Sequence, residues 1–399
     1  MLTKGQLNKY SDVLLWGLKS SREDRYQKND IILLHFELEA IKLAEILQGK
    51  LMDMGMNPIL RLGMTPVMEH NFLEMANNRQ LVFIAPGQKE LLKNINGSIY
   101  LRAPVSLTHL RDINPKKIGK TLVSRKPLRD ILRKREEKGQ YGWTLCTLPT
   151  QELAKQAKLS LKQYSNQIIR ACYLDKPDPV RVWKTIYKDA MSIKKWLNSL
   201  DAKYYHIESD NMDLKITPGK YRQWVGLSGH NIPSFEIFTS PDWRGTEGIY
   251  YSNQPSFRSG NYVEKVKLTF KKGSVVKIEA KKGESFTKKQ LSMDKGACRV
   301  GEFSLTDKRF SRIDKFMANT LYDENYGGRN GNCHIAVGDS YSNTFDGDPS
   351  KLTNQRKNEL GFNDSALHWD LVNTEKKTVT AYLKNGEKTI LYENGIFKF

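Results

Sequence analysis

Short apolar runs and longer amphipathic segments alternate through the first half of the chain. The run IILLHF at residues 31–36 predicts a buried strand, and residues 37–54 place Ile41, Ala44, Leu47 and Leu51 on one face of a helix. Further strands are predicted at residues 59–62, 81–85, 98–101 and 143–148. Because helical or turn-containing segments separate these strands, we expect crossover connections and an α/β N-terminal domain with a mainly parallel sheet.

A long amphipathic helix is predicted to close this half. Residues 178–200 begin with Asp178 and Pro179, which is typical of a helix start, and carry apolar residues at helical spacing. The chain is also longer than a single hydrophobic core usually supports. We therefore expect a domain boundary after this helix, with one domain over residues 1–205 and a second over residues 206–399.

The hydrophobic pattern changes to a period of two in the second half. Val266, Leu268 and Phe270 alternate with lysines, and the alternation resumes after a Lys-Lys-Gly-Ser turn, which predicts a hairpin. Asn-Gly pairs at 385–386 and 394–395 separate three further apolar runs. Few helices are expected here, with candidates at residues 287–293 and 309–318. The pattern predicts a mainly antiparallel β (α+β) domain.

Composition is typical of a globular protein without a disulfide framework. The chain has 39% hydrophobic and 27% charged residues, and its four cysteines lie far apart, with no C-x-x-C pair. The first residues lack the basic and apolar regions of a secretory signal, and no apolar run approaches the roughly 20 residues of a membrane helix. We expect a cytoplasmic protein with reduced thiols and no membrane partner.

The positive charge raises the possibility of a nucleic-acid partner. Lysine and arginine number 64 against 44 acidic residues, a formal net charge of +20. The basic clusters are scattered through the sequence, however, and no nucleic-acid recognition motif accompanies them. We interpret them as solvated surface and expect no specific nucleic-acid partner. The α/β half also lacks the glycine-rich phosphate-binding motifs, which argues against a nucleotide site.

Acidic and imidazole side chains within apolar runs of the second half point to a metal site. His334 lies in NCHIAVG, and His368 and Asp370 are two residues apart, so on a strand they project from the same face. Glu236 and Glu302 also lie in apolar runs, where an unpaired carboxylate is costly to bury and a cation would compensate it. Taken by themselves, His368 and Asp370 could instead form a hydrogen-bonded structural pair that binds no metal.

A third glutamate, Glu324, precedes the glycine-rich loop that leads to His334. Three glutamates, two histidines and one aspartate form a mixed oxygen and nitrogen donor set, which suits zinc, cobalt, manganese or magnesium. Six donors exceed the needs of one tetrahedral ion. We therefore expect two divalent ions that share a bridging carboxylate, an arrangement found in many metal-dependent hydrolases.

Two neighbouring motifs are weaker candidates for chemistry. The segment from Gly226 to His230, with Ser228 at its centre, imitates a nucleophile elbow but lacks the correctly spaced second glycine, so we interpret it as a loop. Cys333 is adjacent to His334, and adjacent residues on a strand point to opposite faces. We therefore expect Cys333 to serve packing.

Five sequence blocks resemble, in order, the motifs of the aminopeptidase T / aminopeptidase S (PepS) family of dinuclear metallo-aminopeptidases. The resemblance covers nearly the whole chain. The blocks are NIPSFEIFTSP around Glu236, RVGE ending at Glu302, LYDEN around Glu324, HIAVGDSY from His334 to Tyr341, and HWD from His368 to Asp370.

The resemblance implies a homodimer with a metal-binding C-terminal domain and assigns roles to seven residues. Glu236, Glu302, His334, His368 and Asp370 match metal ligands, and Glu324 matches an acidic position that serves as a ligand or as a proton acceptor. Tyr341 matches a tyrosine beside the metals. Because Tyr341 follows His334 by seven residues, a regular strand would send them to opposite faces, so we expect Gly338 to break the strand.

The expected reaction is removal of N-terminal amino acids from short peptides by a metal-bridging hydroxide. Glu302 or Glu324 is the candidate general base, and Tyr341 is the candidate donor to the developing oxyanion. Two alternatives remain open at this stage. The same donors would serve a dinuclear metal amidase or hydrolase acting on a non-peptide substrate, or they would be structural groups in a basic, non-enzymatic binding protein.

Overall fold

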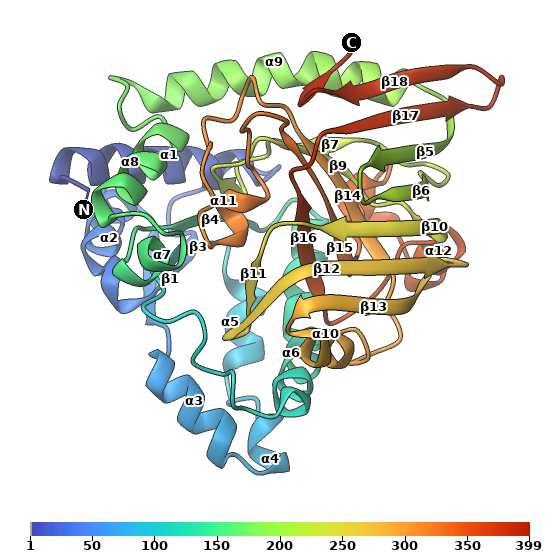
Figure 1. The fold of residues 1–399 in the computed structure, drawn as a ribbon. Helices are drawn as coiled ribbons and strands as arrows, with labels where there is room; N and C mark the ends of the chain where they lie inside the picture. The colour runs from blue at the N-terminus through green and yellow to red at the C-terminus, as the bar shows by residue number, and fades with distance from the viewer. Residues whose placement is uncertain (1) are drawn as a thin grey trace.

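The computed structural model describes residues 2–399 and divides into a helix-rich half and a strand-rich half (Figure 1). The helices of the first half are α1 (Lys4–Ser20), α2 (Ile41–Asp53), α3 (Pro66–Met75), α4 (Asn78–Leu81), α5 (Gln88–Asn94), α6 (Pro115–Glu136), α7 (Gln151–Gln156), α8 (Leu161–Ala171) and α9 (Pro179–Ser199). Its strands are β1 (Ile31–Phe36), β2 (Asn57–Leu62), β3 (Gly97–Arg102) and β4 (Gly142–Thr147).

These four strands and β8 (Asn231–Ile232), which comes from the second half, form a parallel sheet in the order β2-β1-β3-β4-β8. The pairs β1 with β2, β1 with β3, and β3 with β4 are all parallel. Each connection between them contains at least one helix, as crossover between parallel strands requires. The predicted α/β domain with a parallel sheet is therefore confirmed.

Local sequence signals explain where the main helices begin. Thr3 caps α1 and forms a capping box with Gln6, and Asp178 caps α9, whose first residue is Pro179. Helix α9 buries Trp183, Ile186, Ala190, Ile193 and Leu197, which recur at helical spacing. The predicted helix over 178–200 is confirmed to within one residue at each end.

The second half contains most of the strands. They are β5 (Ala202–Ser209), β6 (Asp213–Thr217), β7 (Val225–Gly226), β8 (Asn231–Ile232), β9 (Glu236–Thr239), β10 (Asp242–Ser252), β11 (Ser256–Arg258), β12 (Asn261–Lys271), β13 (Ser274–Lys282), β14 (Val300–Thr306), β15 (Asn332–Gly338), β16 (His368–Asn373), β17 (Lys377–Leu383), β18 (Lys388–Glu393) and β19 (Ile396–Phe397). Its α-helices are α10 (Glu284–Gln290), α11 (Thr320–Asp323) and α12 (Asn354–Glu359).

Two antiparallel sheets organise this half. One has nine strands in the order β11-β12-β10-β6-β5-β17-β18-β19, with β13 paired to β12. The other has five strands in the order β16-β15-β14-β9-β7. Both predicted hairpin regions are present, as β12 with β13 and as β17, β18 and β19. The expected antiparallel β-rich domain is confirmed.

The two halves are joined by backbone pairing as well as by packing. Strand β8, which follows the predicted boundary, pairs in parallel with β4 and forms the last strand of the first sheet. A single large hydrophobic cluster also runs from α1 to the C-terminal strands. The domain limits 1–205 and 206–399 stay a prediction. The structure shows that residues close to β9 are anchored in the N-terminal sheet.

Two local predictions are wrong. Residues 81–85 form no strand, because Asn77 and Gln80 cap the short helix α4, which ends at Leu81, and the following residues lie outside the sheet, with Phe83 60% exposed. Residues 309–318 form no helix. Their backbone is held instead by side chains, since Asp307 accepts from the backbone amide of Arg309 and Asp323 accepts from that of Met317.

Among residues 2–399, no helix combines the length and apolar character needed to cross a bilayer.

Gly338 is expected to be essential to the end of β15. Its φ is +108°, and a Cβ there would lie 2.2 Å from the carbonyl oxygen of Leu367. We expect Gly338→Ala to lower the free energy of unfolding by about 3 kcal/mol or more, from backbone strain together with overpacking. Gly386→Ala is the matched control, because Gly386 has φ +94° but open space around it, so only about 1 kcal/mol should be lost. Urea denaturation checks both, and equal losses would contradict the steric argument.

Candidate metal centre

Five of the predicted metal ligands lie on four neighbouring strands of the five-stranded sheet. Glu236 begins β9, Glu302 lies in β14, His334 lies in β15, and His368 and Asp370 lie in β16. These strands are adjacent in the order β16-β15-β14-β9. Although the ligands span more than 130 positions of sequence, the sheet brings them side by side.

Strand register places the five side chains on one face. His334 is opposite Ser304, which is two residues from Glu302 on β14. Asp370 is opposite Ala336, two residues from His334, and His368 is opposite Gly338. On β9, Glu236 is opposite Thr306. Because alternate residues of a strand share a face, all five side chains point to the same side of the sheet.

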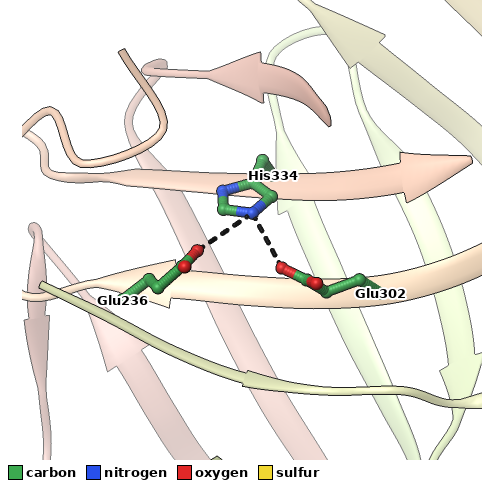
Figure 2. A group of neighbouring side chains, drawn as sticks. All are labelled: Glu236, Glu302 and His334. Atoms are coloured by element: carbon green, nitrogen blue, oxygen red, sulfur yellow. Dashed lines mark hydrogen bonds and ion pairs between the residues drawn. The ribbon is translucent and has the colours of Figure 1, made fainter. Parts of the chain in front are cut away.

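His334 is the centre of the first group of donors. Its Nε2 atom lies 3.1 Å from Glu302 Oε1 and 3.3 Å from Glu236 Oε2 (Figure 2). His334 is 1% exposed, Glu302 3% and Glu236 7%. The three side chains therefore turn their polar ends toward one another in a position that water barely reaches.

Glu302 also belongs to a second group of donors. His368 Nε2 lies 3.6 Å from Glu302 Oε2 and 3.3 Å from Asp370 Oδ1. In each group, one donor atom from every residue lies within 4.8 Å of the others. Two sets of three donors thus share the carboxylate of Glu302, one oxygen of which faces each histidine.

Glu324 and Tyr341 lie beside these groups but in neither of them. Glu324 directly follows α11, is 6% exposed, and accepts a hydrogen bond from Asn231 Nδ2 at 3.3 Å. The ring of Tyr341 meets that of His368 edge-on, with 4.8 Å between centroids. Strand β15 ends at Gly338, so the predicted break allows Tyr341 to return to this side. Both residues line the same small pocket as Glu236, Glu302, His368 and Asp370.

Burial and mutual repulsion shift the pKa values of these groups. Burial, together with the carboxylate of Glu302, raises the pKa of Glu236 to about 8, and burial with Glu236 raises the pKa of Glu324 well above its ordinary value. Burial lowers the pKa of His368, but Asp370 and Glu302 outweigh it and raise that pKa to about 9. Burial opposes ionisation of Asp370 too, yet His368 holds the pKa of Asp370 well below its ordinary value.

The donor set fits divalent cations. Four carboxylates face two imidazoles, three of them buried (Glu236, Glu302 and Glu324) and one half-buried (Asp370). When all four are ionised, their negative charge exceeds what two protonated histidines neutralise. The raised pKa values of Glu236 and Glu324 reflect this crowding of carboxylates together with burial. Carboxylate oxygens with imidazole nitrogens suit zinc, cobalt and manganese, and the donors project from a rigid sheet.

Neighbouring side chains and backbone orient the donors, and most of these contacts have no signal in the sequence. His368 Nδ1 lies 2.9 Å from the carbonyl oxygen of Asp339, which directs Nε2 toward Glu302 and Asp370. The carboxylate of Asp339 pairs with Arg133 of α6, which is 206 positions away. Ser304 Oγ donates to Glu236 Oε2 at 3.3 Å. Of these neighbouring groups, the sequence predicts only Ser304 to lie near the site, because it is two residues from Glu302 on the same strand.

The loop between β7 and β8 also reaches this pocket. The sequence predicts a loop without chemistry here, and the segment is a loop. Its residues Ser228 and His230 nevertheless line the pocket, together with Glu136 at the end of α6. The pocket has a volume of about 80 Å³ and adjoins a larger cavity of about 630 Å³. Cys333 is buried in the core, as expected for a packing residue.

Comparison with known proteins relates this chain to metalloproteases and aminopeptidases. The family model described as "Thermophilic metalloprotease (M29)" matches residues 3–397. Aminopeptidase AmpS of Bacillus subtilis (strain 168) is 26% identical over 337 residues, 79% of this chain and 80% of that protein. Aminopeptidase T of Thermus aquaticus is 30% identical over 266 residues, 64% of this chain and 62% of that protein. The solved structure of wild-type AmpT from Thermus thermophilus has the same fold, with a TM-score of 0.79 at 20% identity over 99% of both chains.

The metal-free protein should become less stable as pH rises from about 4.5 to about 9. The pKa values of Glu236 and His368 are raised in the folded state to about 8 and about 9, from 4.5 and 6.5. The folded state therefore holds more protons than the unfolded chain in this range, and its free energy of unfolding falls with pH.

Urea unfolding of chelator-treated protein at about pH 6 and about pH 8.5 checks this sign. Glu236→Gln should flatten the dependence, because it removes one of the groups that retain protons. A metal-free protein that gained stability toward the higher pH would contradict the expected charge excess.

Proposed function

The chain belongs to the thermophilic metalloprotease (M29) family, and on that basis we propose the reaction that this aminopeptidase carries out. It releases the N-terminal amino acid from short peptides by metal-dependent hydrolysis. Membership in a peptidase family argues against the alternative of a basic, non-enzymatic binding protein. The observation that carries the proposal is the pair of donor groups that share Glu302 within a buried, strongly acidic pocket.

The ligand assignment follows the two donor groups. Glu236, Glu302 and His334 would hold one divalent ion, and Glu302, His368 and Asp370 would hold a second, with Glu302 between them. Such ions, when bound, would supply Lewis acidity for the scissile carbonyl and would lower the pKa of a bound water toward about 7, so that hydroxide is available at neutral pH. Glu324 is either a further ligand or the proton acceptor.

The remaining steps use side chains of this chain. Glu324 accepts the proton of the attacking water, a role supported by its buried position in the pocket, beside both donor groups but in neither of them. Both oxygens of Glu302 face the donor groups, so Glu324 is favoured over Glu302 as the base. Tyr341 donates its phenol hydrogen to the oxyanion that forms at the carbonyl, a role supported by its position against His368.

The preference for short peptides is supported by the shape of the cavities. The inner pocket of about 80 Å³ holds no more than the reacting end of a substrate. The adjoining cavity of about 630 Å³ is in the size range of small-ligand sites and would receive the remaining residues. The identity of the metals, the homodimer and the cytoplasmic location remain predictions from sequence and resemblance.

Removal of metal should abolish activity. We expect chelator treatment to eliminate cleavage of aminoacyl anilides, because the attacking hydroxide depends on bound metal. Addition of zinc, cobalt or manganese should restore cleavage. Acetylation of the substrate amine should also prevent cleavage. A colorimetric assay on the free and acetylated substrates measures both effects. Equal rates on both substrates would indicate an amidase that does not require a free amine.

Loss of His368 should remove metal without unfolding the protein. We expect His368→Ala to reduce bound metal per chain and to lower kcat/KM by at least about 10²-fold, because one donor group loses its imidazole. His70→Ala is the matched control, since His70 pairs with Glu74 and Asp112 in the N-terminal half and should leave both quantities unchanged. Elemental analysis and circular dichroism complete the test. Full activity of His368→Ala would remove this residue from the site.

A further inference from the structure

The boundary between the two cavities is built from a small set of residues. Five residues line both the inner pocket and the outer cavity: Glu136, Trp143, His230, Tyr341 and Asn343. A peptide with its N-terminal residue in the inner pocket and its remainder in the outer cavity would cross this boundary at the bond to be cleaved. The nitrogen that leaves would therefore emerge beside these side chains.

Three of the side chains near this boundary form a continuous chain of polar contacts. Ser228 Oγ and His230 Nδ1 are 2.6 Å apart, and His230 Nε2 is 2.9 Å from Glu136 Oε1. Trp143 Nε1 donates to the same Glu136 oxygen at 3.2 Å, and its ring packs against His230 with 4.6 Å between centroids. The contacts join the loop after β7, the end of α6 and strand β4.

This chain runs from the inner pocket to the outer cavity. Ser228 lines the inner pocket only, whereas His230 and Glu136 line both spaces. The Glu136 side chain is 33% exposed, so its end of the chain is open to solvent. His230 Nε2 is buried and has no aligned hydrogen bond, even though the Glu136 carboxylate is in contact with it. A purely structural network would be expected to satisfy that nitrogen.

The loop that carries Ser228 and His230 is held firmly in place. Gly229 has φ +85°, and a Cβ there would lie 2.7 Å from the carbonyl oxygen of Gly17 in α1. Thr144 Oγ1 donates to the Gly229 carbonyl at 2.9 Å, and the Leu145 amide donates to the His230 carbonyl at 2.7 Å. Contacts from the N-terminal half thus fix the positions of the serine and the imidazole.

We propose that Ser228, His230 and Glu136 form a proton relay that protonates the leaving amine. When the scissile C–N bond breaks, its electron pair goes to nitrogen, and nitrogen takes the proton of the Ser228 hydroxyl. Ser228 Oγ takes the Nδ1 proton of protonated His230, whose positive charge Glu136 stabilises. Neutral His230 regains a proton from water in the outer cavity, and the proton that the base took from the attacking water returns to solvent. This proposal rests on the proposed function.

In this relay the Ser228 hydroxyl, which lines the inner pocket, donates to the leaving nitrogen, so Ser228 is the catalytic residue and His230 and Glu136 act through it. The relay matters only where the leaving group needs a proton. A dipeptide expels a basic amine and depends on protonation, whereas an aminoacyl 4-nitrophenyl ester with the same N-terminal residue expels a phenolate that leaves without a proton. The comparison of these two substrates separates proton donation from a general structural effect.

The test uses three variants of the metal-loaded, full-length enzyme. We expect Ser228→Ala to lower kcat for the dipeptide by about 10²-fold and to change the ester rate by less than about 10-fold, because general acid catalysis contributes about 10²–10⁴-fold. Ser228→Thr keeps a hydroxyl and should restore most of the dipeptide rate. Glu136→Gln, on a partly exposed side chain, should lower the dipeptide rate selectively and provides a second measurement if Ser228→Ala folds poorly.

Metal content and melting temperature are measured for every variant. Equal losses on dipeptide and ester, or no loss on either, would overturn the relay while leaving the proposed function intact. A wild-type enzyme that cleaves neither substrate in a metal-dependent manner would instead overturn the proposed function. The two failures are therefore distinguishable from the same set of rates.

Discussion

The structure depends on a concentration of buried negative charge that one sheet holds in place. Glu236, Glu302 and Asp370 project from three strands of that sheet, with Glu324 beside them. Isolated carboxylates are costly to bury, and the raised pKa values of Glu236 and Glu324 are the direct expression of that cost. A divalent cation would offset this unfavourable arrangement, because the strands of one sheet already hold the candidate donors side by side.

The N-terminal half contributes to the site although it supplies none of its donors. Arg133 of α6 pairs with Asp339, whose backbone carbonyl orients His368. Strand β8 joins the parallel sheet just before the chain enters β9 and reaches Glu236. The α/β half is therefore a structural support for the metal-binding sheet, and it also forms much of the cavity through which a peptide would approach.

The same half completes the polar chain at the boundary of the two cavities. Glu136 and Trp143 come from the N-terminal half, whereas Ser228 and His230 come from the loop after β7. An isolated C-terminal half would retain the metal donors and lose this chain. Binding of the cations and handling of the leaving group are thus carried by different parts of the sequence, and they meet only at the contact between the halves.

The sequence by itself determined the two kinds of sheet and pointed to the candidate donors that the second sheet brings together, because strand periodicity and polar residues within apolar runs are local properties. The strand break at Gly338 is also predictable from the local sequence, since an odd interval between His334 and Tyr341 requires a break in the strand if both side chains are to face the site. The predicted strand at 81–85 and helix at 309–318 are wrong, because a helix cap and hydrogen bonds from nearby aspartates overrode the hydrophobic patterns of these segments. Only the tertiary structure decided that Arg133, Glu136 and Trp143 adjoin the site, since contacts over more than 80 positions follow from how the layers pack and leave no local trace.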